Sequence, residues 1–168
     1  MVYVMKIYVD GGCRGNGKPW AIGAAGAVVT TRSGAVSSYS GGCLPYDPRP
    51  SNQRAEIQAI IYALEKAIAI DRTLRTNPWL EVKIYSDSQY AVSCMNKWIY
   101  KWRRNGWINA AGNPVANQDL IREADRLDDD VRELGSVEYH WISREENHEA
   151  DAYVNEIMDD HERDLCDC

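Results

Sequence analysis

Residues 2–17 read VYVMKIYVDGGCRGNG, and this stretch decides the fold. Its first eight residues are rich in β-branched side chains and Tyr, which is typical of a strand, and we expect this strand to end at Asp10. The glycines that follow predict a turn over residues 11–17. Asp10 has an ordinary interpretation as a turn residue before paired glycines. A carboxylate at the end of an apolar strand also suits a functional site.

Apolar and alternating runs predict four more strands, over residues 21–31, 35–44, 80–86 and 137–142. Apolar residues at helical spacing predict helices over residues 52–68, 88–98 and 117–134, and a last helix capped by Asn147. Three leading strands suggest an antiparallel meander, whereas the later alternation of helix and strand suggests parallel strands. The predicted fold class is α/β: a mixed five-stranded sheet, an antiparallel β-meander plus parallel strands, flanked by helices.

The length of 168 residues suits one domain, which we assign to residues 1–160, with a disordered tail over residues 161–168. No apolar run approaches the roughly 18 residues of a membrane span, and Lys6 inside the first strand does not fit a secretory signal. The five cysteines include no CxxC pair. They predict free thiols and a cytoplasmic location, with a soft-metal pair at Cys166 and Cys168 as the alternative.

The net charge of −6 argues, taken alone, against a nucleic-acid partner. The distribution of charge matters more than the sum, and the sign reverses over residues 97–104, which read KWIYKWRR. Cations interleaved with aromatic rings suit a sugar–phosphate backbone. The alternative is an amphipathic helix whose tryptophans lie in the core.

Four carboxylates lie at positions where the surrounding sequence pattern predicts apolar core residues. Asp10 and Asp87 each end a strand, two residues after a tyrosine, and Glu56 lies near the start of a helix. Asp151 shares a helical stripe with apolar residues three and seven positions later. Each has a bland alternative, as a turn residue, a cap or a favourable charge at a helix N-terminus. Together they predict a site for Mg²⁺, with Mn²⁺ as an alternative, because clustered oxygen ligands suit hard divalent cations.

Four blocks carry a resemblance to a known family. YVDGGCRGN (8–16), NQRAE (52–56), SDSQY (86–90) and NHEAD (147–151) resemble the signature blocks of type 1 ribonuclease H. The resemblance implies a ribonuclease H-like fold and a monomer that hydrolyses the RNA strand of RNA–DNA hybrids. It implies a two-metal-ion mechanism that leaves 3′-hydroxyl and 5′-phosphate ends. The catalytic and metal-binding residues that it implies are Asp10, Glu56, Asp87 and Asp151.

The resemblance also implies positions that contact the hybrid. Amides suit the 2′-hydroxyl of RNA, since both donate and accept hydrogen bonds, although a turn or cap residue is the alternative for each amide. Ser51 matches a hydroxyl that seats a DNA phosphate. The segment 97–107 resembles the family's basic protrusion. The implied substrate-binding residues are Cys13, Asn16, Ser51, Asn52, Gln53, Gln89, Lys97, Trp98, Lys101, Arg103 and Arg104.

One departure and three alternatives stay open at this point. The loop at residues 143–146 lacks the histidine that cellular members of the family carry, so His148, Glu145 and Glu146 are candidates for proton transfer, with a solvent-facing histidine as the alternative for His148. Residues 12–18 fit the phosphate-loop pattern GxxxxGK, but Pro19 replaces the required Ser or Thr and a strand follows. A non-catalytic domain of the same fold and another nuclease of the superfamily are the remaining alternatives.

Overall fold

The computed structural model describes residues 1–166, which form a sheet of five strands covered by helices. The strand order is β3-β2-β1-β4-β5. The first three strands pair antiparallel, and β1, β4 and β5 pair parallel. The predicted fold class is therefore confirmed. The strands are β1 Val2–Arg14, β2 Ile22–Thr30, β3 Val36–Cys43, β4 Trp79–Ser86 and β5 Gly135–Trp141.

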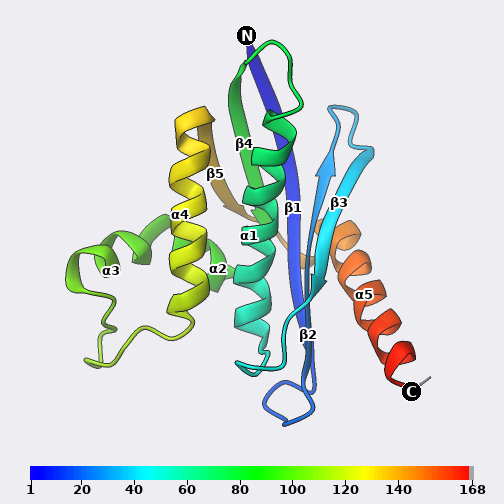
Figure 1. Ribbon diagram of the computed structural model, residues 1–168, viewed down its shortest axis with the longest axis vertical. Helices are drawn as coiled ribbons and strands as arrows, with labels where there is room; N and C mark the ends of the chain where they lie inside the picture. The colour runs from blue at the N-terminus through cyan, green and yellow to red at the C-terminus, as the bar shows by residue number, and fades with distance from the viewer. Residues whose placement is uncertain (167–168) are drawn as a thin grey trace.

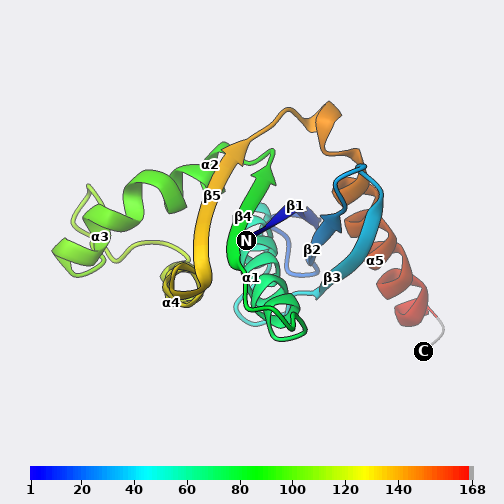
Figure 2. The same cartoon turned by 90° about the horizontal axis from the view of Figure 1, so that it is seen from above.

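Helices cover both faces of the sheet, as Figures 1 and 2 show. Helices α1 and α4 lie side by side on one face, and α5 packs on the other face over β1, β2 and β3. The predicted helix over residues 88–98 is divided, since α2 passes into a π-helical turn at Cys94–Trp98. The helices are α1 Asn52–Asp71, α2 Gln89–Ser93, α3 Ile99–Asn105, α4 Gln118–Leu134 and α5 His148–Cys166, with a short 3₁₀ turn at Arg144–Glu146.

Two apolar cores result from the alternation of side chains along the strands. On β2, Ala25 belongs to the main core beneath α1 and α4, whereas its neighbour Ala24 packs with Val154 and Met158 of α5. Strand β2 is thus buried on both faces, which explains why its sequence shows no polar alternation. No helix among residues 1–166 is long and apolar enough to cross a membrane.

Strand β1 does not end at Asp10, as the sequence predicted, but continues to Arg14. The residues after Asp10 stay paired with β2, with Gly11 beside Ala25. A Cβ at Gly11 would lie 2.3 Å from the backbone carbon of Ala55, so glycine here permits the close approach of α1 rather than a turn. The phosphate-loop alternative fails for the same reason, because the glycine-rich stretch lies between paired strands and not before a helix.

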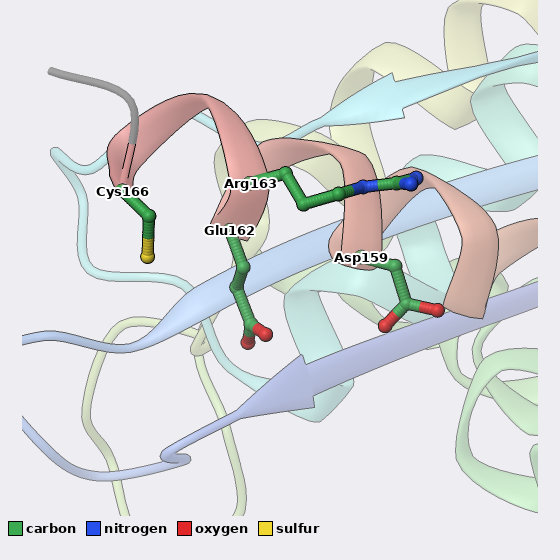
Figure 3. Close-up of a pocket in the computed structure, with 4 residues that line it drawn as sticks. All are labelled: Asp159, Glu162, Arg163 and Cys166. Carbon is green, nitrogen blue, oxygen red and sulfur yellow. The ribbon is translucent and has the colours of Figure 1, made fainter.

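The predicted disorder of residues 161–168 is wrong for residues 161–166, which continue α5. Arg14 Nη1 lies 2.8 Å from a carboxylate oxygen of Asp159 and 3.1 Å from one of Glu162, and these ion pairs hold the helix against β1. Figure 3 shows both carboxylates and Cys166 in the hollow beside this end of α5. Cys166 is exposed, and Cys168, its predicted partner for a soft metal, lies outside the described residues.

Candidate active site

Three carboxylates meet where β1, β4 and α1 come together. One side-chain oxygen from each of Asp10, Glu56 and Asp87 lies within 4.8 Å of the others. The parallel register sets Val9 beside Ser86, so the residues that follow them, Asp10 and Asp87, are neighbours. Glu56 reaches the same point from α1. The structure thus brings together three of the four predicted metal-binding residues.

The structure excludes the purely structural interpretation of each of these three residues, as a turn residue, a helix cap or a charge at a helix N-terminus. Asp10 lies within a paired strand and not in a turn. Ser88, not Asp87, caps α2, because the Ser88 hydroxyl accepts a hydrogen bond from a backbone N–H three residues on, at 3.1 Å. Glu56 is not in the first turn of α1, which contains no acidic residue, so the helix dipole does not account for it.

The cluster is strongly coupled electrostatically. Burial, then the charges of Asp87 and Asp151 and a hydrogen bond with Asp151, raise the pKa of Asp10 to about 8. Burial, then the charges of Asp10 and Asp87, raise the pKa of Glu56 well above its ordinary value. Without a cation, Asp10 therefore favours its protonated form at neutral pH.

These residues fit a hard divalent cation. The Oε2 atom of Glu56 is buried and has no hydrogen-bond partner among the described residues. An unpartnered buried oxygen is costly, and three carboxylates in mutual contact repel one another. Oxygen ligands of this kind suit Mg²⁺ or Mn²⁺, and a bound cation removes both penalties at once.

Asp151 joins the cluster from the first turn of α5. It lies outside the group of three oxygens, yet it is close enough to raise the pKa of Asp10 by its charge and by a hydrogen bond. Val154 and Met158, three and seven residues later, are buried in the core beneath α5. This placement on the inward stripe of the helix agrees with the expectation from the sequence.

Sequence reasoning missed three residues that hold the site in place. Trp141 Nε1 donates a hydrogen bond to the backbone carbonyl of Asp87 at 3.2 Å. Asn147 directly precedes α5, as predicted for its cap, and its carbonyl accepts the backbone N–H of Asp151 at 3.1 Å. Its side chain serves the site instead, since Nδ2 donates to the carbonyl of Val9 at 2.8 Å. Arg144 lowers the pKa of Glu56 through its charge. Only Asn147 carried a signal, as a member of a recognised block, and its role depends on a residue 138 positions earlier.

Comparison with known proteins agrees with this geometry. The family model described as RNase H matches residues 3–161. The chain belongs to the ribonuclease H family. Ribonuclease H of Alkalilimnicola ehrlichii is 36% identical over 160 residues, covering 93% of this chain and 95% of that protein. Ribonuclease H of Thermosynechococcus vestitus is 35% identical over 142 residues, covering 84% of this chain and 78% of that protein.

Solved structures share the fold. LC11-RNase H1 in complex with an RNA/DNA hybrid superimposes with a TM-score of 0.68 at 24% identity, covering 94% of this chain and 98% of that one. RNase H1 from Halobacterium salinarum gives a TM-score of 0.62 at 24% identity, covering 94% and 99%. The sheet order and the helices described above are thus those of a ribonuclease H fold.

The predicted hybrid-contacting residues outside the protrusion lie on three segments of this ribonuclease H, which are the end of β1 with the turn after it, the start of α1 and the start of α2. Asn16 Oδ1 accepts a hydrogen bond from the backbone N–H of Asn52 at 3.2 Å, which joins the glycine-rich turn to the start of α1. Ser51 caps α1 by accepting the N–H of Arg54 at 3.1 Å. Cys13 is half-buried near the end of β1. Gln89 opens α2, and Gln53 lines a hollow of about 350 Å³.

The basic segment forms a protrusion beside this hollow, and Figure 1 shows α3 standing away from the sheet. The Trp98 and Trp102 rings are 5.9 Å apart between centroids, and Trp102 is 6.1 Å from Trp107. Trp107 is buried, whereas Trp98 is exposed and lines the hollow with Lys101. The interpretation of the tryptophans as core residues is thus correct for Trp107, whereas Trp98 is accessible at the surface.

The cations of the protrusion are not equivalent. Arg103 forms an ion pair with Asp125 of α4, and one of its guanidinium nitrogens lies 3.5 Å from Asp129. Lys97, Lys101 and Arg104 are exposed and form no ion pair among residues 1–166. Arg103 is therefore held by the protein itself, and the other three cations are the ones available to a phosphate.

The candidates for proton transfer lie in and beside the short 3₁₀ turn. His148 is exposed, and its Nδ1 is 3.4 Å from the backbone carbonyl of Glu145. The Ser143 hydroxyl donates to Glu146 at 3.3 Å. These contacts agree with the solvent-facing alternative for His148. Neither glutamate contributes an oxygen to the carboxylate cluster.

Proposed function

We propose that the protein is an endonuclease that hydrolyses the RNA strand of RNA–DNA hybrids. The observation that carries this proposal is the meeting of Asp10, Glu56 and Asp87 within 4.8 Å, with Asp151 coupled to Asp10. Membership of the ribonuclease H family and the hybrid bound by LC11-RNase H1 support the same substrate.

Asp10, Glu56, Asp87 and Asp151 would hold two Mg²⁺ ions, with Mn²⁺ as the alternative. Two such ions, when bound, supply an activated water and stabilise the leaving oxygen of a phosphodiester. The two carboxylates whose pKa values are most raised, Asp10 and Glu56, lose their protons when a cation takes up the charge. Affinity for the ions should therefore rise with pH across the neutral range.

The other residues of the site position ligands and strand. The backbone of Gly11 hydrogen-bonds the carboxylates of Asp10 and Glu56, and Trp141 fixes the backbone carbonyl of Asp87. The amide side chains near the start of α1 would contact the 2′-hydroxyl of the RNA strand, which both donates and accepts hydrogen bonds and distinguishes RNA from DNA. Attack by external water, rather than by the adjacent 2′-hydroxyl, leaves 3′-hydroxyl and 5′-phosphate ends.

The test is hydrolysis of three end-labelled duplexes, RNA–DNA hybrid, RNA and DNA, with Mg²⁺, with Mn²⁺ and with EDTA. We expect cleavage of the hybrid alone, and only with a divalent cation. Glu56→Gln should abolish it. Glu65→Gln is the matched control, because Glu65 lies on the same helix but is exposed. Full activity in EDTA, or an unaffected Glu56→Gln enzyme, would contradict the metal-dependent site, whereas no cleavage of any duplex under any condition would favour a non-catalytic domain.

We further propose that the protein acts as a monomer in the cytoplasm. The four cysteines among residues 1–166 are free thiols, as a reducing compartment favours. The molar mass in solution, measured by light scattering, tests the first statement, and fractionation of the source cells tests the second. A dimer at micromolar concentration, or recovery outside the cytoplasm, would contradict the respective statement.

A further inference from the structure

Three aromatic rings stack across the sheet face that α1 does not cover. The register sets Tyr8 of β1 beside Tyr85 of β4, and Tyr85 beside His140 of β5. The Tyr8 and Tyr85 ring centroids are 5.0 Å apart at an interplanar angle of 21°, and those of Tyr85 and His140 are 5.4 Å apart at 25°. Because the rings stack on one another, the stack has two end faces, one at His140 and one at Tyr8.

The Tyr8 end of the stack borders a pocket of about 240 Å³. Lys6 and Tyr8 come from β1, Arg32 from the turn after β2, and residues 146–149 from the segment that leads into α5. No residue of β4 lines this pocket. Since β4 and β2 flank β1 on opposite sides, the pocket lies on the side of Tyr8 away from Tyr85. A planar group placed there would extend the stack by a fourth ring.

The polar groups of the pocket are only partly engaged. Lys6 and Arg32 form no ion pair among residues 1–166. Asn147 is 1% exposed, and its Oδ1 has no hydrogen-bond partner among the described residues. Glu149 lines the same pocket. The pocket therefore offers the aromatic face of Tyr8, two cations, and acceptor oxygens from Glu146, Asn147 and Glu149. A nucleotide can use these groups for its base, its phosphate and its amino group.

We propose that this pocket is a second nucleotide-binding site, which takes an unpaired base of the RNA strand stacked on Tyr8. Its volume is below the roughly 300–1,000 Å³ of drug-sized ligand sites, which suits a single base. Tyr8 is two residues before Asp10 on β1, or about 7 Å along the strand. Asp10 and Tyr8 lie on the same face of β1, so an RNA strand bound at the carboxylates is within reach of this pocket. The choice of RNA rests on the proposed function, whereas the pocket itself does not.

The test compares the binding of two hybrids in EDTA, which prevents cleavage. One is blunt, and the other carries five unpaired RNA nucleotides, at the 5′ end in one series and at the 3′ end in another. We expect one extension to tighten binding about tenfold, the order of magnitude of one base–aromatic stack. Tyr8→Leu, Lys6→Ala and Arg32→Ala should remove that gain. Lys83→Ala is the matched control, because Lys83 pairs with Lys6 across the strands but does not line the pocket.

Each outcome of this experiment decides between supporting and overturning the site. Equal affinity for blunt and extended hybrids would overturn it, as would a loss of the gain in Lys83→Ala alone. Adenosine monophosphate is the second probe. If it binds the protein as tightly as the extended hybrid does, RNA is overturned as the occupant. Arg32 is exposed in a turn, so Arg32→Ala should stay folded even where Tyr8→Leu does not. Cleavage of the blunt hybrid by Arg32→Ala should be unchanged, so failure of the proposed function is seen separately.

Discussion

Replacing Asp10 with Asn should stabilise the metal-free protein at neutral pH. Burial and the charges of Asp87 and Asp151 raise the pKa of Asp10 from its ordinary 3.8 to about 8. The native state therefore keeps a proton that the unfolded state releases. Because the native state binds more protons, the free energy of unfolding of the wild type should fall as the pH rises through this window.

The size of the effect follows from the same pKa. Each pH unit between the ordinary pKa of 3.8 and pH 7 lowers the free energy of unfolding of the wild type by about 1.4 kcal/mol. At pH 7 the total loss due to Asp10 is therefore at most about 4 kcal/mol. Asn keeps the shape of the side chain and removes the titration, but it still buries a polar amide, which lowers the gain. We expect Asp10→Asn to be more stable than the wild type by about 1–4 kcal/mol at pH 7, and by less at pH 5.

Urea denaturation in EDTA at several pH values between 5 and 8 measures this difference, with the exposed Asp47→Asn as the control. Adding Mg²⁺ should then stabilise the wild type more than Asp10→Asn, because only the intact cluster gains binding free energy from the cation. The reasoning is refuted if wild-type stability in EDTA rises between pH 5 and pH 8, or if Asp10→Asn is the less stable protein at pH 8.

Four further predictions concern activity. Asp87→Asn should abolish hydrolysis but leave hybrid binding intact in a mobility-shift assay, and wild-type products should carry 5′-phosphates; a 2′,3′-cyclic phosphate would contradict this. Lys101→Ala should reduce the log–log salt slope of hybrid binding by about 0.7–0.9, whereas Arg103→Ala should leave the slope nearly unchanged, because Arg103 is already paired within the protein. Trp141→Phe loses a hydrogen bond of about 1 kcal/mol, so the Mg²⁺ concentration for half-maximal rate should rise several-fold. His148→Ala should lower kcat by far less than the roughly 10²-fold expected for loss of a general acid. The measurement is kcat as a function of pH for the wild type and for His148→Ala.

The sequence predicted the elements well where the signal is local. The alternation in β1 and the apolar stripe of α1 depend on side chains within a few residues of one another, so the predicted sheet and main helix match the structure. Asp10 and Asp87 were predictable as a pair because each lies two residues after a tyrosine on a predicted strand, and the parallel register of β1 and β4 makes them neighbours. Residue patterns alone left an ordinary alternative open for each carboxylate, and the structure removed that alternative for Asp10, Glu56 and Asp87.

Features that depend on distant partners were not predictable. Paired glycines after a strand predict a turn, but at Gly11 the deciding contact is the backbone of Ala55 in α1. The end of α5 is ordered because Arg14, about 145 positions earlier in the chain, binds Asp159 and Glu162. No periodicity within a helix reports a partner of that kind, so the tail was expected to fray.

The negative net charge is compatible with a nucleic-acid substrate because much of the acidity is paired within the protein. Acidic residues of α4 bind Arg54 near the start of α1, Arg103 of the protrusion and Arg126 of α4 itself. These pairs hold the protrusion and α1 at fixed positions relative to α4, which leaves the exposed lysines of the protrusion and Trp98 facing outward. A few cations beside an exposed tryptophan ring can bind a sugar–phosphate backbone even where the protein surface as a whole is not strongly positive. Recognition of the hybrid then depends on the placement of these groups rather than on total charge.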